Sequence, residues 1–208
     1  MRLREQARQL ARDKRAIAII VGASILIAAL ASLLTPLRYE AQAQLYVSVS
    51  SESDATPADL DLAAELAKQK IKSYVFLVNS TELLERAIDR DGLSTTVGEL
   101  SSRVRGWSPL DTVVMFVIVQ DSDQQRAADI ANGLASDLAN TINDVVEKPE
   151  DGGAGRISVN VVETARAPAV PVAPNVPLNL GVGLLVGLVL GVVYSSVRAA
   201  IPSVRKAP

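Results

Sequence analysis

AIAIIVGASILIAALASLLTPL (residues 16–37) and LNLGVGLLVGLVLGVVYSSV (residues 178–197) are the two stretches of sequence that decide the fold. Neither stretch contains Asp, Glu, Lys or Arg. At a rise of about 1.5 Å per residue, about 20 helical residues cross a hydrocarbon core of roughly 30 Å. The sequence therefore predicts two transmembrane helices, with most of the polar residues between them.

The charges beside the two apolar stretches predict the orientation. Residues 1–15 have a net charge of +4, and residues 198–208 have a net charge of +3. Because cytoplasmic flanks of membrane helices are enriched in Lys and Arg, both flanks are expected in the cytoplasm and residues 38–177 outside it. The whole chain carries −2, so residues 38–177 carry −9. This acidic segment disfavours binding to nucleic acid or to an anionic membrane surface.

A cleaved signal peptide is the alternative for the first stretch, because Ala41-Gln42-Ala43 resembles a small-residue cleavage site. The length of the stretch, and the second apolar stretch that follows, favour a membrane span instead. Five arginines before or beside it are expected to contact lipid headgroups, with an anionic partner as the alternative: Arg2, Arg4, Arg8, Arg12 and Arg15.

The sequence contains neither Cys nor His. Without Cys, the 140 residues between the apolar stretches form no disulfide, and they are enough for one compact domain. Without His, the usual general base, the commonest metal ligand and the Ser-His and Cys-His nucleophiles are excluded. The sequence therefore predicts no enzyme, no bound metal and no cofactor.

The first half of the segment between the apolar stretches predicts one strand and three helices. Residues 41–50 alternate between apolar and polar, which is typical of a half-buried strand. Helices are then expected after Thr56, Ser80 and Thr96, each of which is an N-cap residue type. Their expected ends are near residue 79, near Gly92 and at Gly106.

The second half predicts a strand, a helix and a last strand. Residues 113–119 are all apolar, which favours a strand covered on both faces at the centre of a sheet. Ser122 and Gln125 are expected to form a capping box for a helix that Pro149 ends, and residues 157–161 alternate as the last strand. This order predicts a small extracytoplasmic α/β domain, a mixed sheet with packed helices.

Two regular spacings predict special roles near the second apolar stretch. Four prolines recur every three residues, the repeat of a polyproline II helix: Pro168, Pro171, Pro174 and Pro177. They predict a stiff strut. Its role is either that of a passive linker or that of fixing the angle between domain and membrane. Glycines recur every four residues and predict a membrane-helix packing face, with ordinary glycine tolerance as the alternative: Gly183, Gly187 and Gly191.

The remaining candidate sites have structural explanations. Asp121-Ser122-Asp123 matches the DxD pattern of metal-dependent glycosyltransferases, but its place between a strand and a helix favours capping. Asp59 and Asp61 are expected in the first turn of a helix, where they stabilise its positive end. Trp107, the single tryptophan, is expected to anchor packing or an interface, with stacking on a sugar ring as the alternative.

Several of these segments together resemble a known family. They are the basic N-terminus with the first membrane helix, the strand from Tyr39, TVVMFVIV at residues 112–119 with the following Asp121-Ser122-Asp123, AADIAN at residues 127–132, and the Pro-rich approach to a Gly-rich second helix. This arrangement is similar to the Wzz-type polysaccharide co-polymerases. Gln124 departs from the family, which usually has proline there, and the long helical extension of the enterobacterial regulators is absent.

The resemblance implies a function. It implies a non-enzymatic homo-oligomer of the bacterial inner or plasma membrane that regulates the chain length, polymerisation or export of a capsular polysaccharide or exopolysaccharide, beside a polymerase. One alternative is an adaptor for a cytoplasmic tyrosine kinase, which is expected to be a separate chain because no GxxxxGK[ST] motif occurs. A two-pass sensor or transport accessory protein is the other alternative.

The expected organisation has six parts. In order, they are a cytoplasmic basic N-terminus (1–15), a first membrane helix (16–37), a Wzz-like α/β domain (38–166), a proline strut (167–177), a second membrane helix (178–197) and a cytoplasmic tail (198–208).

Overall fold

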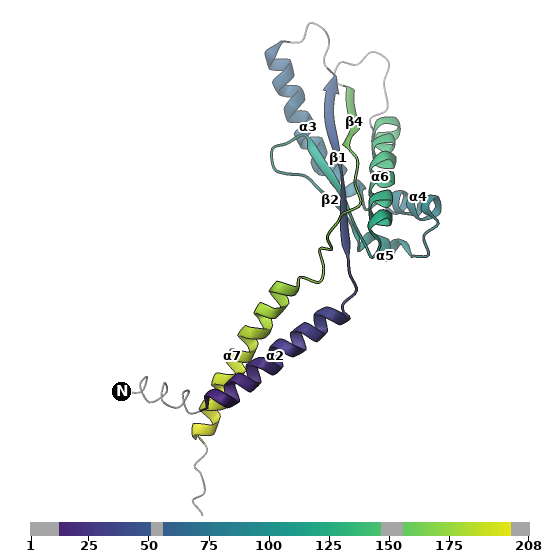
Figure 1. Cartoon of the computed structure of the whole chain (residues 1–208). Helices are drawn as coiled ribbons and strands as arrows, with labels where there is room; N and C mark the ends of the chain where they lie inside the picture. The colour runs from purple at the N-terminus through teal and green to yellow at the C-terminus, as the bar shows by residue number, and fades with distance from the viewer. Residues whose placement is uncertain (1–12, 51–55, 147–155, 201–208) are drawn as a thin grey trace, which may run out of the picture. The chain divides into compact units, whose positions relative to one another are not determined.

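The computed structural model describes residues 13–50, 56–146 and 156–200 and divides into two compact units. The first unit comprises residues 1–37 and 173–208, and the second comprises residues 38–172 (Figure 1). The N-terminal arginines up to Arg12, and Pro149, which was expected to end a helix, lie outside the described residues.

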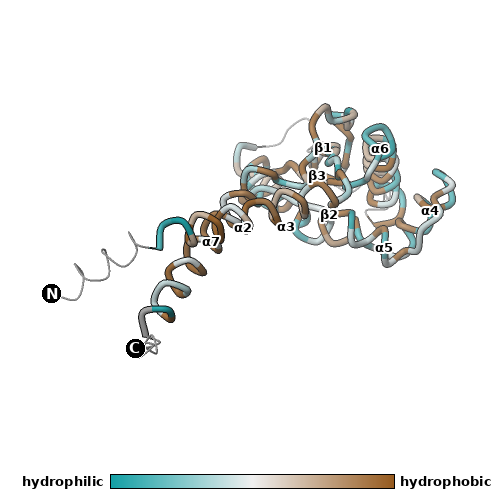
Figure 2. Tube along the Cα trace, turned by 60° about the horizontal axis from the view of Figure 1, so that its bottom comes forward, coloured by the Kyte–Doolittle hydropathy of each residue, from teal (hydrophilic) through white to brown (hydrophobic). Residues whose placement is uncertain are grey.

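The first unit consists of two helices that pack along each other, α2 (Lys14–Leu34) and α7 (Val176–Ala200). Both are long and apolar enough to cross a membrane. Their tubes are largely brown, the hydrophobic end of the scale, in Figure 2. Most of their side chains are exposed within the unit, as expected of helices whose outer surface faces lipid. The two predicted apolar helices are thus confirmed as candidate membrane spans.

A four-stranded antiparallel sheet forms one layer of the second unit. Its strands lie in the order β2 (Val104–Trp107), β3 (Val114–Asp121), β1 (Tyr39–Ser50) and β4 (Arg156–Glu163). The helix that connects β3 to β4 crosses over β1, so these two strands run parallel without being neighbours. Because β1 separates them, every neighbouring pair is antiparallel. The predicted α/β fold with packed helices is confirmed, but the expected mixed sheet is wrong, since the described strands form an antiparallel sheet.

Helices cover one face of the sheet. They are α3 (Pro57–Leu77), α4 (Thr81–Asp91), α5 (Val97–Ser101) and α6 (Gln124–Thr141), which continues as the π-helix η1 (Ile142–Val146). Alternate side chains of β1, among them Ala43 and Leu45, are buried with these helices in a single core cluster. The second unit therefore has two layers, one of helices and one of strands.

The predicted N-cap residues of α3 and α5 are confirmed. Thr56 and Thr96 each accept a hydrogen bond from the third residue of their helix, Asp59 and Glu99, whose side chains bond back to the cap. Ser80 precedes α4 but makes no side-chain capping bond. Gly92 ends α4 with a φ of 58°, the left-handed region where glycine has no steric penalty.

Two expectations for the middle of the chain are wrong. The helix that starts after Thr96 ends at Ser101, and the next residues form strand β2, which the sequence analysis missed. The capping box of Ser122 and Gln125 does not form. Instead Asp123 caps α6 and accepts a hydrogen bond of 2.8 Å from the Arg126 amide, because its carboxylate lies at the N-cap position itself.

The central strand β3 is covered by helices on one face only. Met115, Val117 and Val119 are fully buried in the core. Phe116 and Ile118 point to the other face, where Trp107 of β2 stacks on Phe116 with 5.4 Å between ring centroids. The strand lies inside the sheet as expected, but the expected cover on both faces is absent within the described chain.

Candidate functional site

The glycine face of α7 lies against α2 of the same chain. Gly183, Gly187 and Gly191 are buried, and none has room for a side chain. A Cβ built on Gly187 would lie 2.8 Å from the Cα of Val21, whereas one built on Gly181 would meet nothing within 4 Å. The three glycines therefore let the two backbones approach closely, which maximises van der Waals contact between membrane helices. Packing of this face between subunits stays a prediction.

Polar contacts flank the glycine face at both ends. Near the start of α7, Asn179 Nδ2 donates to Ser32 Oγ at 2.8 Å. Near its end, Ser195 Oγ donates to one carboxylate oxygen of Asp13 at 3.1 Å, and Arg198 donates to the other at 3.2 Å. Such bonds contribute about 0.6 to 2 kcal/mol each between membrane helices. Together they fix how far α7 can slide along α2.

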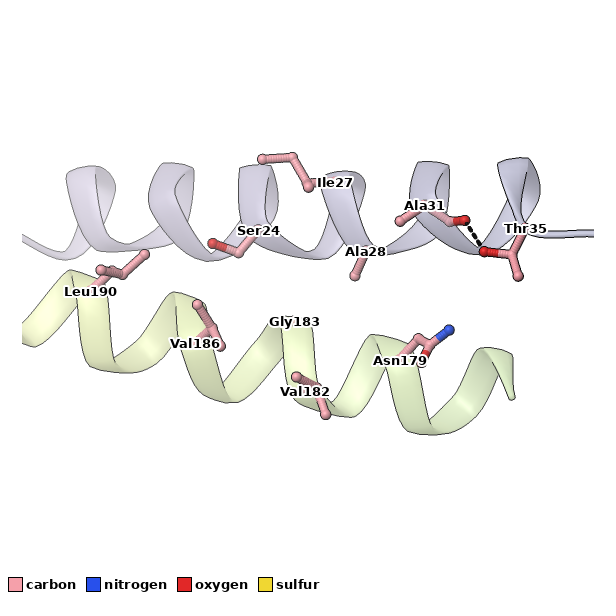
Figure 3. A pocket seen from close by; sticks show the side chains of 10 residues that line it. All are labelled: Ser24, Ile27, Ala28, Ala31, Thr35, Asn179, Val182, Gly183, Val186 and Leu190. Carbon is pink, nitrogen blue, oxygen red and sulfur yellow. Dashed lines mark hydrogen bonds between the residues drawn. The ribbon is translucent and has the colours of Figure 1, made fainter. Parts of the chain in front are cut away.

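A groove runs beside the contact of α2 and α7 (Figure 3). It has a volume of about 460 Å³, and none of its lining residues is charged. The Thr35 hydroxyl at one end bonds back to the carbonyl of Ala31 at 2.8 Å, as the dashed line in Figure 3 shows. The groove offers an apolar surface and no group for acid–base chemistry.

The segment that follows β4 is held to the second unit at two points. Asn132 in α6 bonds both backbone groups of Ala165, donating to its carbonyl at 3.0 Å and accepting from its amide at 2.7 Å. The Val172 amide donates to the carbonyl of Arg38 at 2.8 Å. The last residue of this unit therefore lies beside its first residue, at the end of the sheet where β1 begins.

Three of the four prolines of the predicted strut lie outside helices and strands, and the fourth lies in α7. Pro168, Pro171 and Pro174 lie in residues 164–175, which have no helix or extended strand. Pro177 is the second residue of α7. Proline is well tolerated there, because the first amides of a helix have no acceptor within it. Pro177 is therefore not part of a strut, and the polyproline conformation of the other three stays a prediction.

Asp121 is the one charged residue of the described chain that is almost fully buried, at 1 % exposure. It accepts hydrogen bonds from Arg103 at 2.7 Å, from Arg126 Nε at 2.8 Å and from the Asp123 amide at 3.0 Å. Burial raises its pKa, but the bonds from Arg126 and Asp123 and the two positive charges outweigh it, so the pKa lies below the ordinary value. The carboxylate therefore joins the end of β3 to α6 and to Arg103, the residue that precedes β2.

This arrangement corrects one expectation about Asp121-Ser122-Asp123. Only Asp123 caps the helix, whereas Asp121 anchors two arginines. Asp59 completes the α3 capping box, and the hydrogen bonds from Thr56 lower its pKa. Within residues 13–50, 56–146 and 156–200, no three Asp or Glu side chains gather where they could hold a metal ion.

Trp107 lies at the end of β2, beside the connection to β3. The indole is 49 % exposed and stacks on Phe116. A second groove, with a volume of about 280 Å³, lies between this connection and α3. The sequence offered no signal for this groove, because its two walls are about 35 residues apart along the chain.

Comparison with known proteins adds three findings. Residues 1–90 match the family model Wzz, described as "Chain length determinant protein". The chain is 29% identical over 150 residues to "Probable capsular polysaccharide biosynthesis protein YwqC" of Bacillus subtilis (strain 168), and the aligned region covers 72% of this chain and 56% of the relative. It is 26% identical over 132 residues to "Capsular polysaccharide biosynthesis protein CpsC" of Streptococcus pneumoniae, covering 64% and 52%.

The chain thus spans about half the length of the curated relatives it matches. The family match covers α2, β1, α3 and most of α4, whereas the strand and helix at residues 112–132 and the Pro- and Gly-rich segments lie beyond it. The resemblance to the Wzz family of chain length determinant proteins is thereby confirmed over residues 1–90, in a chain similar to two capsular polysaccharide biosynthesis proteins.

Proposed function

We propose that this protein is a non-enzymatic membrane scaffold that regulates the chain length, polymerisation or export of a surface polysaccharide. One observation carries the proposal. Two candidate membrane helices, packed along a glycine face, flank an α/β unit in a chain whose residues 1–90 match the Wzz family. The names of both relatives refer to capsular polysaccharide biosynthesis, which supports the class of polymer.

The proposed location is a bacterial plasma membrane, with both flanks cytoplasmic and residues 38–166 outside. The positive charge of both flanks supports this orientation. The adjacent ends of the second unit, Arg38 and Val172, are compatible with two helices that enter the membrane side by side. A reporter that is active only outside the cytoplasm should be active when inserted within residues 152–155 and inactive when fused after Pro208. The opposite pattern would contradict the orientation.

The proposed partners are further copies of the chain and a separate polysaccharide polymerase or export machine. A scaffold acts through contacts, and the second unit presents uncovered side chains on one sheet face, such as Tyr46 and Trp107. A non-catalytic role is supported by the carboxylates described above, which form caps and ion pairs. Residues 168–174 are proposed to hold the domain at a set distance from the membrane.

The experiment that tests the function is deletion of the gene, followed by sizing and quantification of the surface polysaccharide. The scaffold proposal predicts a shifted or broadened length distribution with unchanged sugar composition and linkage, because the enzymes that join the sugars remain. Restoration by the wild-type chain is the control. If deletion leaves polymer length unchanged but alters phosphorylation of a cytoplasmic tyrosine kinase, the kinase-adaptor alternative replaces the scaffold.

A further inference from the structure

Strand β4 lies at one edge of the sheet, and its outer side is bonded by side-chain amides of a helix. Asn143 bonds both backbone groups of Val159, accepting from its amide at 2.8 Å and donating to its carbonyl at 2.9 Å. Asn132 bonds Ala165, just beyond β4, in the same way. A side-chain amide carries the same donor and acceptor as a peptide group. Asn143 therefore takes the place of one peptide group of a neighbouring strand.

The two asparagines share a face of the continuous helix formed by α6 and η1. They are about three helical turns apart, or about 16 Å along the axis. Val159 and Ala165 are separated by about 20 Å of extended chain. The helix thus follows the edge of the sheet, as α6 and β4 show in Figure 1, and both amides reach the strand.

The backbone groups that Asn143 bonds point away from the sheet. Val47, the partner of Val159 in β1, donates its amide to the carbonyl of Val113 on the β3 side, at 2.8 Å. Because backbone direction alternates along a strand, Ile157 and Val161 also direct their amides and carbonyls outward. Asn143 therefore holds the middle one of three residues to which another strand could bond.

The strand at the opposite edge of the sheet, β2, matches β4 in direction. Neighbouring strands are antiparallel throughout the order β2, β3, β1 and β4, so β2 runs opposite to β4. Strand β2 of a second copy, with the same orientation in the membrane, would continue this alternation beside β4. Such a contact joins unlike surfaces of two copies and can repeat from copy to copy.

The two edges also match in the face that the helices cover. The Gln120 amide donates to the carbonyl of Arg103 at 2.8 Å. Because backbone direction alternates, Val104 and Gly106 direct their amides and carbonyls away from β3. Val104 is buried in the core and a Cβ on Gly106 would meet α3, so both lie on the covered face, as Val159 does. Joined edge to edge, two copies would carry their helices on the same side of one sheet.

One register satisfies these conditions. With Val159 opposite Gly106 of the second copy, and Val161 opposite Val104, outward-facing residues meet outward-facing residues. Asn160 then lies opposite Arg105, and both side chains are exposed on the uncovered face. The first of these pairs needs the amide and the carbonyl that Asn143 holds.

We infer that the outer edge of β4 is a docking strand for β2 of a second copy, and that Asn143 keeps this edge closed. Direction, face and register allow the two strands to pair, and the side-chain amide takes the bonds that the pairing needs. Copies that assemble in the membrane therefore meet through other surfaces, and each sheet ends at its own β4. The inference deepens the proposed function and rests on the assembly of several copies that it includes.

Cross-linking between two cysteine variants tests the inference, in a chain without other cysteines. Chains with Asn160→Cys and chains with Arg105→Cys are mixed in the same proteoliposomes and treated with a short thiol cross-linker. In joined sheets the two Cβ atoms would lie about 5 Å apart, within its reach. We expect little mixed dimer while Asn143 is present. Adding Asn143→Ala to the Asn160→Cys chain should raise the yield about fivefold to tenfold, because two competing hydrogen bonds are lost.

Two further variants control for folding and for position on the helix. Asn143→Asp can still accept from the Val159 amide but cannot donate to its carbonyl, so its cross-linking should be intermediate. Asn140→Ala removes an exposed asparagine of the same helix that makes no hydrogen bond within the described chain, and it should behave as the wild type does. Amide exchange in nanodiscs with one chain each should be about tenfold faster at Val159 in Asn143→Ala, and unchanged at the buried Val117.

Three results would overturn the inference. They are strong cross-linking between chains that keep Asn143, equal cross-linking by Asn143→Ala and Asn140→Ala, and unchanged exchange at Val159 in Asn143→Ala. Failure here is separate from failure of the proposed function. Cross-linking and exchange are measured on the protein alone, whereas the deletion strain tests polymer length.

Discussion

Replacing Gly187 by alanine should weaken the packing of α7 on α2 more than the same change elsewhere in the helix. The added Cβ would lie 2.8 Å from Val21 Cα and 3.1 Å from Ser24 Cβ. Carbon atoms in contact are ordinarily about 3.5 to 4.0 Å apart, so the helices must separate locally by about 1 Å. A backbone Cα cannot rotate away, so the strain is not relieved by a change of rotamer.

The magnitude follows from this geometry. Overpacking of a close contact costs about 1 to 3 kcal/mol. The separation also stretches the flanking hydrogen bond of Asn179 to Ser32, which is 2.8 Å long. Gly191→Ala should cost less than Gly187→Ala, because the nearest atom is the side-chain Cγ2 of Ile17 at 2.8 Å, which can shift. Gly181→Ala should change stability by less than about 0.5 kcal/mol, since nothing lies within 4 Å of its Cβ.

The assay compares the three alanine variants in the same detergent or bicelle. Thermal unfolding gives their relative stabilities, and a short thiol cross-linker between Ser32→Cys and Asn179→Cys reports whether the helices stay adjacent, in a chain without other cysteines. We expect the order Gly187→Ala, Gly191→Ala, Gly181→Ala from least to most stable. Equal stability of Gly187→Ala and Gly181→Ala would refute the proposed close approach at the glycine face.

Three further predictions concern the second unit and its connection. Asp121→Asn should destabilise the unit by about 1 to 3 kcal/mol at neutral pH, discounted for the solvent exposure of Arg126. Folding lowers the pKa of Asp121. The stability that the wild type gains from this carboxylate is therefore present above its ordinary pKa of about 3.9 and is lost as the pH falls through the lowered pKa. Urea titrations at decreasing pH should show this loss in the wild type and not in Asp121→Asn. Gly133→Ala should displace the Arg90 guanidinium, which lies over Gly133 and bridges Asp91 and Asp137. Because that group is the end of a flexible side chain and alanine favours a helix interior by about 0.5 to 1 kcal/mol, chemical denaturation should show a net change below about 1 kcal/mol, whereas a loss of several kcal/mol would show that Arg90 cannot move aside. A Gly/Ser replacement of residues 168–174 should leave protein abundance near normal and broaden the polysaccharide length distribution on gels, and unaltered length would show a passive spacer.

The helix and strand starts were predictable where one local signal dominates. The alternation of apolar and polar residues after Ala41 predicted β1, and Thr56 followed by proline predicted the start of α3. Strand β2 was missed because it has four residues, and one of them, Gly106, is a residue that commonly ends a helix. Its strand conformation depends on pairing with β3 and on the close approach of α3, which are tertiary contacts.

Spacing predicted which residues of the candidate sites share a face, but not what they contact. The interval of four between Gly183, Gly187 and Gly191 indicated a packing face. That α2 of the same chain lies on this face required the structure. The ion pair of Arg103 with Asp121 gave no signal, because the two residues are 18 apart in the sequence and meet only through the pairing of β2 with β3.

We propose that this chain sets polysaccharide length without joining sugars. The most direct measurement is the length distribution of the surface polysaccharide in a deletion strain that produces the wild-type chain at graded levels, with sugar composition and linkage determined in parallel. We expect the modal length to change with the amount of the protein while composition and linkage stay constant. Constant polymer length at every level, including complete absence of the protein, would contradict it.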